Sequence, residues 1–93
     1  MARRPPSVAK RDANEPEIFA ELRAWGLSVY PMDLPADALV GISGRTYLVE
    51  IKTPKGKLTG PQETFLKTWR GDHTILRSIE DATAFARMVR GLP

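Results

Sequence analysis

Apolar residues recur along the chain with two different spacings, which separate predicted helices from predicted strands. A helical spacing ends near Gly26, and the same spacing returns twice in the second half of the chain. Four shorter runs are apolar or β-branched, and the one that ends at Lys52 alternates with a period of two. The predicted helices cover about residues 14–25, 59–70 and 78–90, and the predicted strands about residues 27–30, 37–42, 46–52 and 73–77.

The order of these elements, αβββαβα, predicts an α/β fold. Three consecutive strands with short connections favour an antiparallel meander, and a fourth strand reached through a helix should join in parallel. We therefore predict one domain, residues 13–93, with a mixed β-sheet flanked by helices. Residues 1–12 contain several Arg and Lys and a Pro pair without periodicity, which predicts a flexible basic arm.

Local signals mark the helix ends and faces. Asn14 is followed three residues later by Glu17, and Thr59 is followed three residues later by Gln62, a spacing typical of capping boxes. Trp25 and Trp69 fall on apolar helical faces, so we expect both to pack in the core rather than stack on bases.

Composition and charge narrow the function classes. Lys and Arg number 14 against 11 Asp and Glu, and several acidic residues lie between Asp12 and Asp37, so the remainder is more basic and favours a polyanionic partner. The absence of cysteine excludes disulfides and thiolate metal sites, which leaves oxygen ligands for a metal. No apolar run has the length of a signal peptide or membrane span, so we expect a cytoplasmic protein without a membrane partner.

Two carboxylates and an ammonium group are predicted to converge at one end of the sheet. Glu50 and Lys52 lie two positions apart on a strand and share a face, and Asp37 begins the preceding strand. Oxygen ligands of this kind suit Mg²⁺, which typically binds one or two carboxylates together with substrate phosphate oxygens. Phosphodiester hydrolysis fits this set. An isolated Glu-x-Lys pair is also common on solvated strand edges, and the upstream Asp37 is what favours the catalytic interpretation.

Three segments, Ala-Asp37-Ala-Leu-Val-Gly, Tyr-Leu-Val-Glu50-Ile-Lys52 and Leu-Thr-Gly-Pro-Gln62, resemble the small VRR-NUC nucleases of the PD-(D/E)XK superfamily, which occur as stand-alone proteins in phages. The segment from Asn14 to Leu27 is also similar to the start of archaeal-type Holliday-junction resolvases. The resemblance spans about residues 12–83 and implies a restriction-endonuclease-like core. It also suggests a phage-encoded protein that acts in the host cytoplasm.

The resemblance implies roles for the matched residues of the strands. Asp37, Glu50 and Lys52 would be catalytic, and Asp37, Glu50 and the backbone carbonyl of Ile51 would hold Mg²⁺, for which Mn²⁺ could substitute. The family usually has Pro directly before its Asp, whereas here the Pro stands two positions earlier. Asp33 is therefore an alternative, but Asp37 is preferred because an apolar strand follows it.

The helices contribute further residues under the same resemblance. Glu15 would supply the acidic group of the first helix, in preference to Glu17, which would have a capping role. Gln62 would help to position Lys52 or a water molecule, with a purely capping role as the alternative.

Basic residues of the arm and of the second half of the chain are predicted to line a path for DNA phosphates, with a merely solvated surface as the alternative. They are Arg3, Arg4, Lys10, Arg11, Lys55, Lys57, Lys67 and Arg70.

Together these features predict a Mg²⁺-dependent endonuclease for branched DNA such as a four-way junction. A homodimer is expected, because a short chain has a modest core and two symmetric cuts suit two-fold symmetry. The alternatives are a nicking or flap-cleaving repair nuclease without junction preference, and a nucleic-acid-binding module of the same fold that does not cleave.

Overall fold

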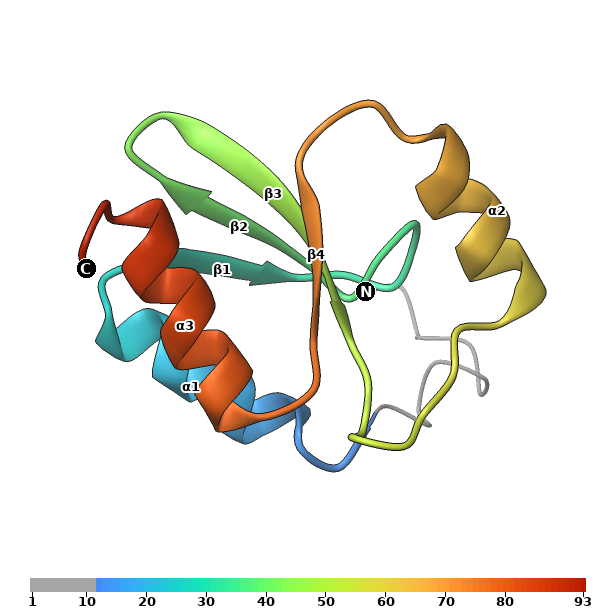
Figure 1. The fold of residues 1–93 in the computed structure, drawn as a ribbon, viewed down its shortest axis with the longest axis horizontal. Coiled ribbons are helices and arrows are strands. Elements are labelled where there is room, and N and C mark those ends of the chain that lie inside the picture. The colour runs from blue at the N-terminus through green and yellow to red at the C-terminus, as the bar shows by residue number, and fades with distance from the viewer. Residues whose placement is uncertain (1–11) are drawn as a thin grey trace, which may run out of the picture.

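The computed structural model describes residues 12–93 of the chain. The predicted contacts of the basic arm, Arg3, Arg4, Lys10 and Arg11, lie outside this range. The predicted αβββαβα order is confirmed, with element boundaries within three residues of those expected (Figure 1). The elements are α1 (Glu15–Ala24), β1 (Ser28–Pro31), β2 (Ala38–Ile42), β3 (Arg45–Ile51), α2 (Gly60–Thr68), β4 (His73–Leu76) and α3 (Ile79–Val89).

The four strands form one mixed sheet in the order β1-β2-β3-β4. The first three strands pair antiparallel as a meander, and β4 joins β3 in parallel, as the sequence predicts. In the β2–β3 hairpin Ala38 lies opposite Val49, and in the parallel pair Glu50 lies opposite Ile75. The hairpin reverses at Ser43 and Gly44, which both adopt a positive φ.

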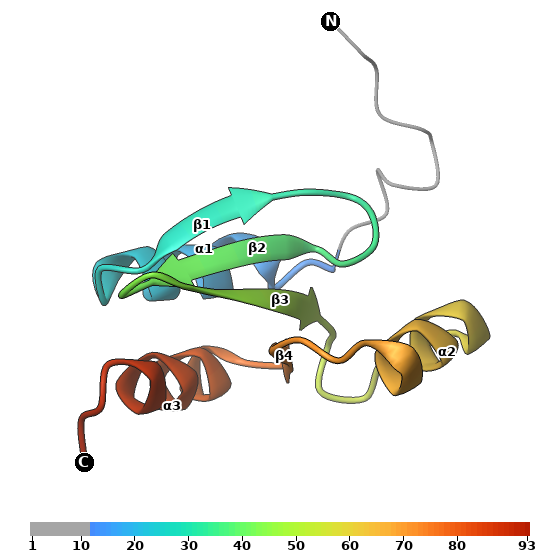
Figure 2. The same cartoon turned by 90° about the horizontal axis from the view of Figure 1, so that it is seen from above.

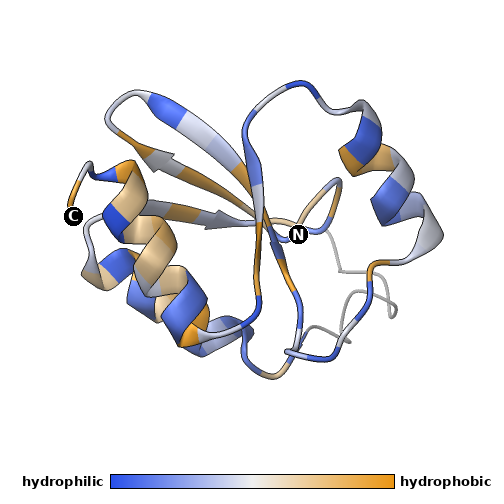
Figure 3. Ribbon diagram, viewed as in Figure 1, coloured by the Kyte–Doolittle hydropathy of each residue, from blue (hydrophilic) through white to orange (hydrophobic). Residues whose placement is uncertain are grey.

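One face of the sheet carries the hydrophobic core. Helices α1 and α3 pack against each other, and the core joins Ile18 and Leu22 of α1 and Phe85 of α3 to alternate residues of β2 and β3. The rings of Tyr47 and Phe85 meet edge to face, with centroids 5.2 Å apart. Figure 3 shows apolar stretches in β2, β3 and α3, against the mainly hydrophilic loop that leads from β3 to α2.

The opposite face of β3 presents a different set of side chains. Leu48 and Glu50 alternate with the core residues of the strand and therefore point away from the main hydrophobic cluster, although both are buried. The period of two thus separates the core from the candidate site within a single strand.

Helix α2 stands apart from α1 and α3, beyond one end of the sheet (Figures 1 and 2). It contains no buried residue. Trp69, just after the helix, is 41% exposed and stacks on Phe65 at a centroid distance of 5.5 Å. The prediction that Trp69 packs in the core is wrong, because α2 lies outside the layer formed by α1 and α3. Trp25 is partly buried against the core, as expected.

Of the two predicted capping boxes, one is present in the structure and one is not. At α2 the box is confirmed, because Thr59 and Gln62 exchange both hydrogen bonds. At α1 the prediction is wrong: Asn14 makes no side-chain cap, and Glu17 is exposed. Asn14 has helical backbone angles, φ −84° and ψ −1°, rather than the extended conformation typical of capping side chains. None of the described helices is long and apolar enough to cross a membrane.

Glu21 links α1 to α3 through its carboxylate. Its Oε2 accepts a hydrogen bond of 2.7 Å from the Thr83 hydroxyl and one of 2.8 Å from Trp25 Nε1. These two bonds, the Thr83 bond first, lower the pKa of Glu21 from its usual value. The link therefore contributes stability above pH 4.5 or so and loses it as the pH falls through the folded-state pKa.

We predict that Thr83→Val lowers the melting temperature at pH 7 by a few degrees, because the variant removes the hydroxyl but keeps the side-chain shape. The difference from wild type should shrink at a second, acidic pH that is low enough to protonate Glu21, whose pKa is lowered. Thermal denaturation at both pH values measures this, with Thr64→Val on exposed α2 as the control. Equal melting temperatures of wild type and Thr83→Val at pH 7 would contradict the link.

Candidate active site

Asp37 is placed at the site by the register of the hairpin. Because Ala38 pairs with Val49, the residue before Ala38 comes to lie beside Glu50. The Asp37 backbone N–H donates to the Val49 carbonyl at 3.0 Å, and its own carbonyl accepts from Met32 at 2.8 Å. Its Oδ2 accepts a 2.7 Å hydrogen bond from the backbone N–H of Ile51. Three hydrogen bonds therefore fix both the backbone and the carboxylate of Asp37.

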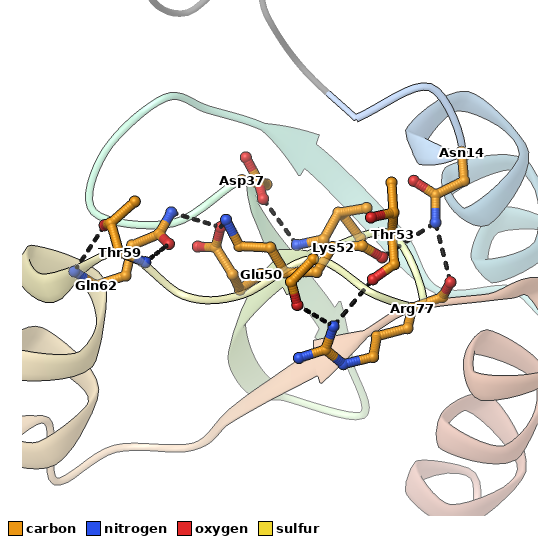
Figure 4. A network of polar contacts seen from close by, with 10 residues as sticks. Asn14, Asp37, Glu50, Lys52, Thr53, Thr59, Gln62 and Arg77 are labelled. Atoms are coloured by element: carbon orange, nitrogen blue, oxygen red, sulfur yellow. Dashed lines mark hydrogen bonds and ion pairs between the residues drawn. The ribbon is translucent and has the colours of Figure 1, made fainter.

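Glu50 lies at the centre of the cluster and is 6% exposed. Its Oε2 accepts a 3.0 Å hydrogen bond from Gln62 Nε2 and lies 4.0 Å from the ammonium Nζ of Lys52. Figure 4 shows these side chains converging from β3, from the start of β2 and from the first turn of α2. The predicted convergence of Asp37, Glu50 and Lys52 is present in the structure.

The environment of Glu50 raises its pKa to about 8. Burial is the largest cause, followed by the negative charge of Asp37 and a hydrogen bond with the Asp37 carboxyl group; Asp12 adds a smaller repulsion, and Lys52 opposes the shift. Two adjoining carboxyl groups that cannot both ionise readily hold a proton between them. A divalent cation at this point would replace that proton.

Gln62 has the capping role that the sequence leaves open as one alternative, and it also contacts Glu50. Its Oε1 accepts from the Thr59 backbone N–H at 2.8 Å and completes the capping box, while its Nε2 donates to Glu50. The same amide thus begins α2 and orients the carboxylate. It contacts Glu50 rather than Lys52.

Lys52 follows the last residue of β3 and is half-buried. Its backbone N–H donates to the Leu76 carbonyl at 3.1 Å, which continues the β3–β4 pairing by one residue. Its carbonyl accepts a 3.1 Å hydrogen bond from Asn14 Nδ2. The peptide groups on both sides of the Lys52 Cα are therefore held by neighbouring elements.

Acidic residues at the start of the chain lie at the edge of this cluster. Glu15 is buried at the first position of α1, next to Asn14, but the charges identified as acting on Glu50 are those of Asp37, Asp12 and Lys52. The proposed role of Glu15 stays a prediction. Asp12 was missed by the sequence analysis, which assigned it to the flexible arm.

The predicted DNA-binding residues within the described range are all exposed and fall into two groups. Lys55 and Lys57 lie on the loop between β3 and α2, three and five residues after Lys52. Lys67 lies in the last turn of α2 and Arg70 just beyond it, so Lys67 is about 8 Å along the helix axis from Gln62. Only Lys55 and Lys57 adjoin the acidic cluster directly in the chain.

Two polar residues to which the sequence analysis gave no role in the site contact the segment after β3. Asn14 Nδ2 donates to the carbonyls of Lys52 and Arg77, at 3.1 and 3.0 Å. Arg77 Nη1 donates to the carbonyls of Thr53 and Gly56, at 2.9 and 2.5 Å. The only sequence signals at these positions were a capping-type residue and a basic residue at a strand end, neither of which specifies such partners.

The donor set of the cluster is small for a divalent cation. Among residues 12–93, no group of three or more acidic or His side chains surrounds one point. Asp37 and Glu50 provide two carboxylates, and the backbone group of Ile51 that contacts them is its N–H, which donates to Asp37. Such a set fits Mg²⁺, which keeps several waters and binds substrate phosphate oxygens, better than it fits a cation that needs a complete protein cage.

Comparisons with models of known protein families, with curated proteins and with solved structures give no match for this chain. Its function is therefore inferred from the residues and the geometry of the site.

We predict that Glu50→Gln stabilises the metal-free protein at pH 8, because Gln resembles the protonated carboxyl group. Between pH 4.5 and about 8 the folded wild type holds a proton that the unfolded chain has lost, so this group makes stability fall as the pH rises. The variant should melt several degrees higher at pH 8 and close to wild type at pH 4.5, since 1 kcal/mol corresponds to about 4 to 8 °C for a domain of this size.

The measurement is thermal denaturation in chelator, with Glu80→Gln on the exposed side of α3 as the control. Mg²⁺ should stabilise wild type more at pH 8.5 than at pH 6 and should not stabilise Glu50→Gln. A wild-type melting temperature that stays level from pH 5 to 8 while other groups are unchanged argues against the raised pKa.

Proposed function

We propose that the protein is a divalent-metal-dependent endonuclease that hydrolyses phosphodiester bonds in DNA. The observation that carries the proposal is the placement of Asp37 beside the buried Glu50, with Lys52 Nζ 4.0 Å from the Glu50 carboxylate. Two acidic groups and an ammonium aimed at one point are costly to assemble unless a ligand uses them.

Each residue of the cluster has a defined task in this proposal. Asp37, Glu50 and the Ile51 carbonyl would hold Mg²⁺, or Mn²⁺ in its place, which when bound supplies charge neutralisation at the phosphate and a more acidic water. The Lys52 ammonium orients the attacking water or stabilises the charge that develops on the phosphate. Gln62 keeps the Glu50 carboxylate in place through its 3.0 Å hydrogen bond.

The proposed substrate is DNA, because exposed cations adjoin the acidic cluster. Lys55 and Lys57 extend from the loop that follows Lys52, where they can contact phosphates on either side of the scissile bond. Such contacts carry little sequence information, so recognition would depend on the backbone and on DNA shape. The preference for branched DNA rests on the resemblance to Holliday-junction resolvases.

A homodimer is also proposed, because a four-way junction, the substrate that the resemblance suggests, needs two symmetric cuts. Helix α2 offers a surface for it. A groove of about 390 Å³ between α2 and β4 is lined by Leu58, Leu66 and Ile75, with Glu63 and Lys67 at its rim. Opposite charges one helical turn apart can pair across a two-fold axis, because each copy then presents the same patch to the other.

We predict that Asp37→Asn, Glu50→Gln and Lys52→Met each lower the cleavage rate by roughly 100-fold or more while DNA binding persists, because each removes a charge at the reacting phosphate. Purified protein is incubated with linear, flap and four-way DNA, with Mg²⁺ or with chelator. Asp33→Asn, in the loop just before Asp37, is the matched control and should cut normally.

The same assay separates the alternatives. Equal cutting of nicked, flap and four-way DNA would favour a repair nuclease without junction preference. Tight binding without cleavage in Mg²⁺ or Mn²⁺ would favour a non-catalytic binding module. A near-normal rate for any of the three site variants would overturn the assignment of that residue.

We predict that the protein has about twice the 10.4 kDa chain mass in solution at micromolar concentration. Leu66→Glu should shift it to a monomer, because a charge would enter the apolar groove, whereas Thr64→Glu on the exposed side of α2 should not. Light scattering measures the mass, and a four-way junction should receive paired nicks within one binding event. A monomeric wild type that nicks each junction once would leave the nuclease proposal standing without the dimer.

A further inference from the structure

The chain leaves β3 through a segment that is held by side chains from two other elements. Asn14, directly before α1, and Arg77, directly after β4, donate hydrogen bonds to backbone carbonyls of Lys52, Thr53 and Gly56. Figure 4 shows both side chains reaching this segment on the side opposite Gln62. These contacts join residues 21 to 38 positions apart in sequence, so they are tertiary rather than local.

Asn14 acts on the backbone of Lys52. It is partly buried, makes no helix cap, and uses both amide hydrogens on the carbonyls of Lys52 and Arg77. The Lys52 N–H is held at the same time by the Leu76 carbonyl. With both adjoining peptide groups fixed, the direction in which the Lys52 side chain leaves the backbone is fixed as well.

Arg77 acts on the loop that follows, residues 53–58, here named the lysine loop because it carries Lys55 and Lys57. The Thr53 carbonyl accepts from both Arg77 and the Gly56 N–H, the latter at 3.0 Å, which closes a tight turn. The turn is compact, since a Cβ at position 56 would lie 2.9 Å from the Thr53 hydroxyl. The Arg77 guanidinium is thus engaged with protein carbonyls.

We propose that Asn14 and Arg77 are positioning residues of the nuclease site, with Asn14 fixing Lys52 for catalysis and Arg77 fixing the lysine loop for DNA binding. This inference rests on the proposed function. Its physical basis is that reacting groups must be held within fractions of an ångström, and that a preformed loop loses less entropy when it binds. Asn14 therefore acts on the rate of cleavage, and Arg77 acts on the affinity for DNA.

The test for Asn14 compares Asn14→Ala with Thr83→Val. Asn14→Ala removes two tertiary hydrogen bonds at the start of α1, and Thr83→Val removes one, which Thr83 makes with Glu21 rather than with Lys52. Asn14→Ala should lower kcat by roughly 10- to 100-fold at saturating four-way DNA with little change in the dissociation constant, whereas Thr83→Val should lower only the melting temperature. Asn14→Asp, which keeps the shape but loses both donors, should behave like Asn14→Ala. Similar kcat values for Asn14→Ala and Thr83→Val would overturn the role of Asn14.

The test for Arg77 compares Arg77→Met with Arg23→Met. Arg23 is a matched control, because it carries the same charge and donates to a backbone carbonyl, that of Val29, at the edge of the sheet. Arg77→Met should weaken DNA binding by about tenfold, the effect expected from releasing the two lysine side chains, with kcat little changed. An equal loss of affinity in both variants would show that only net charge matters and would overturn the role of Arg77.

Amide hydrogen exchange tests the same contacts without any activity. In Asn14→Ala the Lys52 N–H should exchange faster by a larger factor than core amides do, and in Arg77→Met the Gly56 N–H should do so. Thr83→Val and Arg23→Met should change both amides only in step with global stability. If wild type cleaves no DNA, the proposed function fails and with it the catalytic part of this inference, while the exchange data still decide whether the two side chains hold the segment. Unchanged exchange at Lys52 and Gly56 would overturn the positioning itself.

Discussion

The register of the β2–β3 hairpin is the constraint on which the candidate site depends. A shift of one residue would turn Glu50 toward the core and move Asp37 away from it, because successive side chains of a strand alternate between faces. The apolar alternation of Tyr47, Val49 and Ile51 opposes such a shift, since it would carry all three out of the core cluster. The hydrophobic core thus fixes the position of the two carboxyl groups, which lie on the opposite face of the sheet.

Burial of the acidic pair is offset by groups that come from several elements. The Ile51 N–H donates to Asp37, Gln62 donates to Glu50, and the Lys52 ammonium lies nearby. These donors satisfy carboxylate oxygens that would otherwise be costly to remove from water. Because Gln62 also caps α2, the position of that outlying helix is tied to the site rather than to the core.

The features of the fold that follow from local periodicity and from the short turn of a hairpin could be predicted from the sequence. The element order follows from spacings of two and of three to four residues, and the convergence of Asp37, Glu50 and Lys52 follows from a short turn between alternating strands. Tertiary hydrogen bonds could not be read in the same way. Asn14 has the residue type of a cap, and only the fold reveals that its amide instead donates to the carbonyls of Lys52 and Arg77. For Trp69, an apolar helical face was visible, but not whether another layer would cover it.

In the proposed function, metal binding by Asp37 and Glu50 would change the net charge of the cluster and so affect the binding of DNA. With Glu50 protonated, the negative charge of Asp37 is balanced by the Lys52 ammonium, so these three groups together are close to neutral when no metal is bound. In the proposed nuclease, Asp37 and Glu50 would hold a divalent cation in place of that proton, which would give these groups a net positive charge a few residues before the exposed Lys55 and Lys57. A phosphate is then attracted most strongly when the cation is present, because opposite charges in a partly buried site are weakly screened. Binding of the metal would thereby raise the affinity for DNA next to Lys52. Metal binding and substrate binding would then be coupled.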